Sequence, residues 1–394
     1  MTNHDVTIIG AGLAGLQCAR LLARHGVNVL LVDRKNTLDQ KIHTTGIFVR
    51  RTFVDFDIPE DCLGPPVRHV TLYSPAKRFL ELVSDNDEYR IGRMGQLYLR
   101  YLQQCLHAGV RWLPHTGYVG HSIAGDRVTV QLSTGTITTR YLIGADGARS
   151  RVARDLKLDL NREWIFGVEG VYEGAKLDGP PRLLCFVDPK LAPGYIAWIA
   201  HDGDETHVGV GGYQSQFDPP AALEAFRESV NDIIDLRHAK LIEQRAGYIP
   251  VGGVLRNIAN THGLLIGDAA GAVSPLTAGG LDPCMRLSAL AANVVTEYLA
   301  GGDRQTLTRY SGNEFRARFT SRLWARRIAS IFQHRPLIEV GCAVMGLPLL
   351  NRVARHIFFG RNSFPDVDMN YARCGSPHCP TTASGPEFWP KTKA

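Results

Sequence analysis

The stretch DVTIIGAGLAGLQCARLLARHGVNVLLVD (5–33) constrains the fold of this chain more than any other feature. Apolar residues run through Val6–Ile9 and again through Val29–Val32, which predicts two short buried strands. Between them, apolar side chains recur at helical spacing from Leu16 to Ala23. Strand, tight turn, helix and strand form one βαβ unit, so the sequence predicts an α/β protein with a parallel sheet.

The turn after the first strand carries the glycine pattern GxGxxG. Glycines at these positions permit a tight turn and let backbone N–H groups approach a pyrophosphate at the positive end of the following helix. An aspartate then ends the second strand, where its carboxylate can accept hydrogen bonds from a ribose. The pattern does not by itself separate FAD from NAD. The predicted dinucleotide-binding residues of this unit are Gly10, Gly12, Leu13, Ala14, Gly15, Asp33 and Arg34.

Two later segments also lead a predicted strand into an aspartate. In YLIGADGARSRVAR (141–154) the strand reaches Asp146 and Gly147, and in GLLIGDAAGAVSPLTAGGLDP (263–283) it reaches Asp268. The residues that follow the second aspartate are small, which leaves room for a ligand against the backbone. A carboxylate at that place favours a ligand that donates hydrogen bonds from hydroxyls or amides.

Taken in this order, the three motifs resemble the FAD-binding pattern of the glutathione-reductase-like flavoproteins, in their hydroxylase branch. The resemblance implies that Asp146 lies near the FAD pyrophosphate and that Asp268 contacts the ribityl chain. Arg93 matches an arginine before the third helix, and is either a pyrophosphate contact or a surface residue. Asp282 is a predicted N-cap of a helix whose positive end faces the flavin. The other predicted cofactor residues are Lys41, Val119, Gly147, Pro275, Gly279, Gly280 and Leu281.

A narrower resemblance covers roughly residues 5–300. The segments 39–48, 143–158, 192–213 and 247–286 are similar to the geranylgeranyl reductase family. That resemblance implies an FAD-dependent oxidoreductase that reduces C=C bonds of an isoprenoid-like or other apolar substrate by hydride transfer from the reduced flavin N5. The alternative is an NAD(P)H-dependent flavin monooxygenase that hydroxylates or epoxidises through a C4a-hydroperoxide, and halogenases are further relatives.

The sequence departs from the geranylgeranyl reductase pattern in three places: at the predicted catalytic residue His43, around the predicted substrate residues Tyr195 and Trp198, and at Ala278. The family often has a cysteine where this chain has His43, and an imidazole could supply the proton that alkene reduction needs. A loop histidine can equally be a hydrogen-bonding or surface residue. Tyr195 and Trp198 stand in a degraded family segment and are predicted to line an apolar substrate pocket, or else to pack the core. Where the family has the first glycine of its flavin loop, this chain has Ala278.

No second GxGxxG unit with a following helix is visible, so NAD(P)H or another electron donor is expected to bind transiently. The expected fold is a Rossmann-like FAD-binding domain with an inserted antiparallel β-sheet substrate domain and C-terminal helices. The expected boundaries are 1–68, 94–160 and 247–300 for the FAD-binding domain, 69–93 and 161–246 for the substrate domain, 301–372 for the helices and 373–394 for an irregular tail.

The net charge of +6 arises mainly in the C-terminal part, because residues 301–372 contain 11 arginines, no lysine and 5 acidic residues. The arginines form either a solvated helix face or a surface that docks on an anionic membrane. No recognition module for nucleic acid accompanies this charge, and no metal site is expected. The chain lacks a run of about 20 apolar residues, so no transmembrane helix is predicted. Scattered cysteines favour a cytoplasmic protein, peripheral to the inner face of a membrane if the helices dock.

Overall fold

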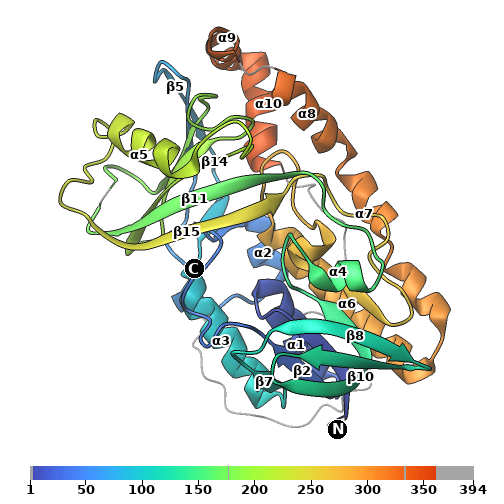
Figure 1. The fold of residues 1–394 in the computed structure, drawn as a ribbon. Coiled ribbons are helices and arrows are strands. Elements are labelled where there is room, and N and C mark those ends of the chain that lie inside the picture. The colour runs from blue at the N-terminus through green and yellow to red at the C-terminus, as the bar shows by residue number, and fades with distance from the viewer. Residues whose placement is uncertain (1–2, 176, 332–333, 361–394) are drawn as a thin grey trace, which may run out of the picture.

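The computed structural model describes residues 3–175, 177–331 and 334–360 of the 394-residue chain. Two sheets stacked one above the other dominate the molecule, and a series of C-terminal helices runs along one edge past both of them (Figure 1). The predicted α/β fold with an inserted antiparallel sheet and C-terminal helices is confirmed. The predicted tail at 373–394 lies outside the described residues.

The first sheet is the one that the βαβ motif predicts. It has seven strands in the order β7-β2-β1-β10-β9-β8, with β16 paired to β10. The strands β7, β2, β1, β10 and β16 are parallel, whereas β8 and β9 extend one edge as an antiparallel meander. The strands are β1 (Asn3–Ile9), β2 (Val29–Val32), β7 (Arg111–Leu113), β8 (Tyr118–Ala124), β9 (Arg127–Leu132), β10 (Gly135–Gly144) and β16 (Gly263–Leu265).

Helix α1 (Leu13–Arg24) packs between α3 (Met94–His107) and α6 (Leu281–Gly301) beside this sheet. Two glycines allow α1 to start so close to the strands. Gly10 has a positive φ of 106° and a Cβ there would lie 2.2 Å from the carbonyl oxygen of Ala145. A Cβ on Gly15 would lie 1.9 Å from the carbonyl oxygen of Gly10. Any larger residue at either position would therefore push the helix away from the sheet.

The second sheet has the order β15-β11-β14-β13-β12-β4-β5, and all neighbours are antiparallel except β12 and β4. Helix α5 (Pro219–Ser229) covers one face, where Phe226 packs edge-on against Phe186. The strands are β4 (His69–Tyr73), β5 (Phe79–Val83), β11 (Trp164–Glu173), β12 (Arg182–Phe186), β13 (Ala197–His201), β14 (Glu205–Gly212) and β15 (Lys240–Pro250).

One strand expected in the second sheet lies elsewhere. The segment at 89–92 forms β6 (Tyr89–Ile91), which pairs with β3 (Ile47–Val49) in a separate two-stranded sheet. This pairing brings the loop that precedes β3 against the second sheet. The remaining short elements are α2 (Arg50–Asp55), α4 (Arg151–Asp155) and the 3-10 turns η1 (Glu60–Cys62), η2 (Gly267–Ala270) and η3 (Arg304–Arg309).

The C-terminal helices bridge the two sheets along the edge that is orange to red in Figure 1. Arg316 donates to the carbonyls of Gly252 and Val254, and Arg335 pairs with Asp188 at 2.5 Å beside the second sheet. In the described part of the chain no single helix is long and apolar enough to cross a bilayer. Taken as a pair, α9 and α10 have the required length and composition, but the two helices are bent by 98° relative to each other. The helices are α7 (Gly312–Arg318), α8 (Thr320–Ile331), α9 (Arg335–Met345) and α10 (Pro348–Phe359).

Candidate functional site

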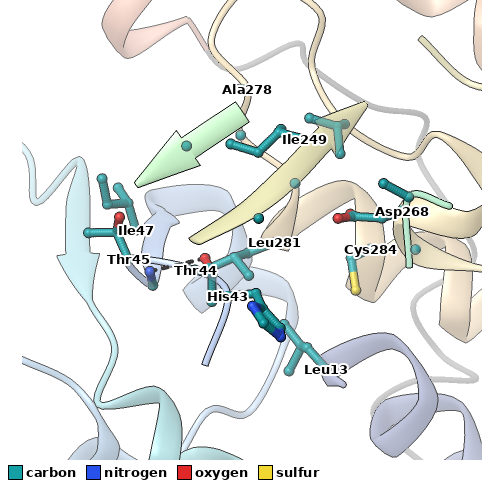
Figure 2. Close-up of a pocket in the computed structure, with 18 of the residues that line it drawn as sticks. Leu13, His43, Thr44, Thr45, Ile47, Ile249, Asp268, Ala278, Leu281 and Cys284 are labelled. Carbon is teal, nitrogen blue, oxygen red and sulfur yellow. Dashed lines mark hydrogen bonds between the residues drawn. The ribbon is translucent and has the colours of Figure 1, made fainter. Parts of the chain in front are cut away.

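A large cavity lies between the two sheets, with a volume of about 1760 Å³. It opens at the carboxyl ends of the parallel strands, the edge at which α/β sheets bind their ligands. The opposite wall is the inner face of the second sheet, and α9 and α10 close one end. Figure 2 shows side chains from separate elements around it, among them Leu13 of α1, Asp268 of η2, Leu281 and Cys284 of α6, and Ile249 of β15.

The N-terminus of α1 faces this cavity without a capping side chain. Its N-cap residue is Gly12, and no side chain accepts from the first turn of the helix. A Cβ at Gly12 would meet nothing within 4 Å, so the space beside the glycine is open. Uncapped backbone N–H groups at a helix start, with free space beside them, fit the pyrophosphate of a dinucleotide.

Two of the predicted aspartates hold the loops that form the cofactor end. The carboxylate of Asp33 accepts from the backbone N–H groups of Ala11 and Lys35 at 2.7 and 2.8 Å, so it fixes the glycine loop. The carboxylate of Asp146 accepts from the N–H groups at the start of α4 and from the hydroxyl of Ser150 at 2.6 Å. Both residues also line the cavity, where they can meet a ribose or a phosphate-bound water.

Asp268 stands at the third predicted position with no such partners. Burial raises the pKa of its carboxyl to about 6, and burial is the only cause of the shift. Asp268 is half-buried at the cavity wall, and a ligand that donates hydrogen bonds to its carboxylate would stabilise the charged form. The hydroxyls of a ribityl chain would do so, and the residue therefore fits FAD.

The small residues after Asp268 lead into α6, whose N-terminus faces the cavity as well. Helix α6 begins at Leu281, and its N-cap is Gly280 with no capping side chain. The prediction that Asp282 caps this helix is wrong. Its carboxylate lies within the first turn and accepts from the fully buried guanidinium of Arg286 at 2.9 to 3.0 Å. The uncapped helix end remains available to the flavin ring edge.

Most of the predicted cofactor residues meet around the cavity. The lining includes Gly10, Gly12, Leu13, Ala14, Asp33, Arg34, Asp146, Gly147, Asp268, Gly279, Gly280 and Leu281. Gly15 is absent from the lining because it serves the close packing of α1. The others that do not line it are Lys41, Arg93, Val119 and Pro275.

The structure gives physical reasons for two of these, Arg93 and Val119. Arg93 donates to the carbonyls of Asp61 and Leu63 and pairs with Asp204 at 2.6 Å, so its guanidinium is held away from the cavity. Val119 is exposed on β8 at an irregularity in the pairing of this strand with β9, and its neighbour Tyr118 lines the cavity instead. A cofactor role for Arg93 or Val119 therefore requires a contact that its side chain does not make with this cavity.

His43 lines the cavity beside the second sheet. Its Nδ1 lies 2.8 Å from the carbonyl oxygen of Ala246, which assigns the proton of the neutral ring to Nδ1 and leaves Nε2 as an acceptor. Burial lowers the pKa of this imidazole, although the carbonyl opposes that shift, and the cations Lys35 and Arg34 lower it further. A proton donor role for His43 stays a prediction, and it requires that the ring be recharged during turnover.

The predicted substrate residues Tyr195 and Trp198 both line the far part of the cavity, with their rings 6.3 Å apart in an edge-on arrangement. Sequence reasoning missed the apolar wall around them. Its strand residues show only the alternation common to any half-buried strand, and nothing in the sequence predicts that α10 closes the end. The missed apolar residues include Leu72, Tyr89, Leu183, Cys185, Val187, Ile196, Met345, Ala354, Ile357, Phe358 and Phe359.

Comparison with known proteins agrees with this geometry. The chain matches the family described as FAD binding domain over residues 3–56 and 102–323. Digeranylgeranylglycerophospholipid reductase 1 of Methanopyrus kandleri is 28% identical over 359 residues, which cover 86% of this chain and 93% of the relative.

Two solved structures share the fold. A geranylgeranyl bacteriochlorophyll reductase-like protein from Thermoplasma acidophilum has a TM-score of 0.79 at 18% identity, covering 92% of this chain and 98% of that one. The p-nitrophenol 4-monooxygenase PnpA from Pseudomonas putida has a TM-score of 0.71 at 16% identity, covering 91% and 97%. At these identities the likeness concerns the fold alone.

Proposed function

This chain belongs to the FAD binding domain family and is an FAD-dependent oxidoreductase, and we propose that it reduces C=C bonds of an isoprenoid-like lipid. The relatives that carry a reductase name act on digeranylgeranylglycerophospholipid, as that name says. The proposal for this chain rests on the cavity itself, which continues from the FAD end into a long apolar end.

The residues that would hold FAD are those of the cofactor end. The N–H groups around Gly12 would bind the pyrophosphate, Asp33 a ribose, and Asp268 the ribityl chain. The uncapped start of α6 at Gly280 would favour negative charge on the ring edge. Reduced FAD supplies a hydride, and the remaining tasks of substrate binding, exclusion of water and proton supply fall to the protein.

The single observation that carries the proposal is the apolar end of the cavity. A volume of about 1760 Å³ exceeds the roughly 300–1000 Å³ of a typical small-molecule site, so a second, long ligand fits beside the cofactor. Beyond Trp198 the wall is built mainly from Leu183, Val187, Ile196 and Phe359. Such a wall gains free energy from burying a hydrocarbon chain, at about 25 cal/mol per Å² of apolar surface.

The experiment is anaerobic turnover with product mass as the readout. Purified protein with FAD, a chemical reductant and a geranylgeranyl lipid should yield a product heavier by two hydrogens for each double bond reduced. A product that instead gains oxygen, and only when O₂ is admitted, would identify a monooxygenase and reject the reductase proposal. The shared fold with PnpA makes that outcome the relevant alternative.

We also propose that the C-terminal helices dock on the inner face of an anionic membrane, where such a lipid would be found. The outer faces of α8 and α9 expose Trp324, Ile328, Leu337 and Val340, while Met345 and α10 line the apolar cavity end. Arginines of the same helices would meet anionic head groups. One set of helices thus has an apolar outer surface and forms the wall of the lipid-sized cavity.

A further inference from the structure

Thr45 connects the cavity to a buried polar network in the second sheet. Thr45 lies in the loop before β3 and lines the cavity (Figure 2). Its hydroxyl donates to the carboxylate Oε2 of Glu169 at 2.5 Å. Glu169 belongs to β11, is 3% exposed, and also lines the cavity. A hydroxyl at the cavity wall is therefore bonded directly to a buried acid.

Glu169 has three further neighbours. The indole N–H of Trp198 donates to the same Oε2 at 3.2 Å. The other oxygen, Oε1, lies 3.5 Å from Nδ1 of His207 and 3.5 Å from Nη1 of Arg245. Neither of these approaches reaches hydrogen-bond geometry, so Oε1 and both ring nitrogens of His207 lack a formed bond in the described structure. Glu169 and His207 are therefore neighbours at 3.5 Å without a formed hydrogen bond between them.

His207 lies between Glu169 and a second buried carboxylate, Asp202. The ring is 1% exposed, and its Nε2 lies 3.7 Å from the carboxylate of Asp202. Asp202 is itself held by the N–H groups of Asp204 and Glu205 at 3.0 and 2.7 Å. Asp204 is exposed in the turn between β13 and β14. Two carboxylates thus flank one imidazole, with the cavity on one side and an exposed turn on the other.

The charges of the network set where a proton resides. Burial alone would lower the pKa of His207, yet the nearby carboxylates of Asp202 and Glu169 raise it to about 9. Burial raises the pKa of Glu169, and His207, Thr45 and Arg245 together bring it below its usual value. The other titratable groups nearby are His201 on β13, Glu205 on β14 and Glu243, which pairs with Arg245 on β15 at 2.7 Å. Both shifts favour the charged forms, an imidazolium at His207 beside an ionised Glu169.

We propose that His207, Glu169 and Thr45 form a proton relay that protonates the substrate in the cavity, a proposal that rests on the proposed reduction of C=C bonds. One proton from Thr45 and one hydride from reduced FAD add across the double bond. The π electron pair forms the new C–H bond with the proton, the neighbouring carbon takes the hydride, and the cofactor is oxidised by two electrons. His207 first passes its proton to the ionised Glu169, and the Thr45 hydroxyl, which donates to Glu169 in this structure, turns to accept that proton as it gives its own to the substrate. His207 then recovers a proton from solvent.

Two other roles for the cluster are less consistent with these contacts. A purely structural ion pair would be expected to close its hydrogen bonds, whereas the nitrogens of His207 stand 3.5 and 3.7 Å from their carboxylates. Ligand atoms of Asp202, Glu205 and His207 lie within 4.8 Å of one another and could hold a metal ion. A metal at His207 would displace the proton on which the relay depends, and stoichiometric metal in the purified protein would overturn the proposal.

The first test needs no turnover. In ¹⁵N-labelled protein with FAD bound, the His207 ring should titrate near pH 9, and Glu169→Gln should lower its midpoint, because one of the two flanking carboxylates is lost. A ring that is neutral at pH 7 in the wild-type protein overturns the relay. This result is independent of substrate, so it separates failure of the relay from failure of the proposed function.

The second test uses single turnover of protein with reduced FAD and a geranylgeranyl lipid. Glu169→Gln and Thr45→Val should each slow product formation by about 10²-fold or more, which is the contribution usual for a positioned proton donor. Thr45→Ser should keep most of the rate and the solvent deuterium isotope effect. The matched control is Glu173→Gln, an exposed glutamate of the same strand. An unchanged rate and pH profile in folded Glu169→Gln and Thr45→Val proteins would overturn the relay.

Discussion

The hydroxyl of Tyr89 donates a hydrogen bond to the backbone carbonyl of Phe358, which joins β6 to the end of α10. The tyrosine is 7% exposed and lines the apolar end of the cavity. This contact fastens the last described helix over the site. The cavity end is therefore closed by a segment that lies about 270 residues away in sequence from the strand that holds it.

Tyr89→Phe should loosen α10 without unfolding the protein. The lost hydrogen bond is worth about 1 kcal/mol, and it leaves the carbonyl of Phe358 without its partner. Amide hydrogen exchange across 350–359 should accelerate several-fold, and the affinity for an isoprenoid lipid should fall. Tyr298→Phe removes a comparable bond to the carbonyl of Thr261, so it serves as the control. Equal exchange across α10 in both variants would contradict the role of Tyr89.

Asp268 should make the apoprotein less stable as the pH rises. Its folded-state pKa of about 6 lies above the ordinary aspartate value of 3.8, so folding favours the protonated form. Its unfavourable contribution is absent below pH 3.8 and develops fully as the pH passes 6. The measurement is the difference in free energy of unfolding between wild type and Asp268→Asn across pH 4 to 7. A difference that does not vary with pH would show that the carboxyl is not buried in this way.

FAD should bind the ionised form of Asp268, because ribityl hydroxyls donate to a carboxylate. Affinity for FAD should therefore increase through pH 6 in the wild-type protein and lose this dependence in Asp268→Asn. Equilibrium dialysis with FAD absorbance measures it directly. If the two proteins gave the same pH profile, the ribityl contact assigned to Asp268 would be wrong.

Arg286→Met should be strongly destabilising. The guanidinium is fully buried and pairs with Asp282 at 2.9 Å and with Asp55 at 2.7 Å, so its removal leaves buried charge without its partner. Breaking such a pair costs about 3–5 kcal/mol. Urea unfolding of the apoprotein measures this. The double variant Asp282→Asn/Arg286→Met should recover part of the loss, and no recovery would argue that lost packing rather than charge is responsible.

Ala278→Gly should stabilise the loop before α6. Ala278 has a φ of +51°, a left-handed conformation that costs a residue with a Cβ about 1–2 kcal/mol. Glycine removes that strain, although it also gives the unfolded chain more freedom. The net expected gain in free energy of unfolding is about 1 kcal/mol. A loss of stability would mean that the left-handed conformation is not kept in solution.

The membrane proposal makes a separate prediction. Replacing the exposed Leu337 and Val340 with glutamate should abolish pelleting with vesicles that contain anionic phospholipid. Ile123→Glu changes an equally apolar exposed residue on β8, far from α8–α10, and should leave pelleting intact. Absence of pelleting by the wild-type protein at low salt would reject membrane docking.

The cofactor end was predictable from the sequence because its signals are local. Gly10, Gly12, Asp33 and Asp268 each stand at a strand end within a short motif, and strands of one parallel sheet deliver their ends to the same edge. The N-cap prediction for Asp282 failed because the carboxylate is captured by Arg286 one turn later. That competition depends on burial, which the capping pattern does not reveal.

The apolar end and the proton network were not predictable, because they depend on contacts between distant segments. Glu169 reads as an ordinary polar residue of an alternating strand, and only the fold sets it against Thr45 and His207. The same holds for Phe358, whose helix carries no motif. The exposure of Val119 also escaped prediction, because the pairing of β8 with β9 is irregular between Tyr118 and Gly120 and the strand pattern does not reveal this.

The most direct test of the account is anaerobic oxidation of the reduced protein by a geranylgeranyl lipid. Protein with photoreduced FAD is mixed with the lipid in the absence of O₂ and of any other electron acceptor, and the visible flavin absorbance is followed. If the protein reduces C=C bonds of this lipid, the oxidised flavin spectrum should return in proportion to the double bonds reduced. If the spectrum stays that of the reduced protein until O₂ is admitted, the chain is not a C=C reductase for this class of substrate.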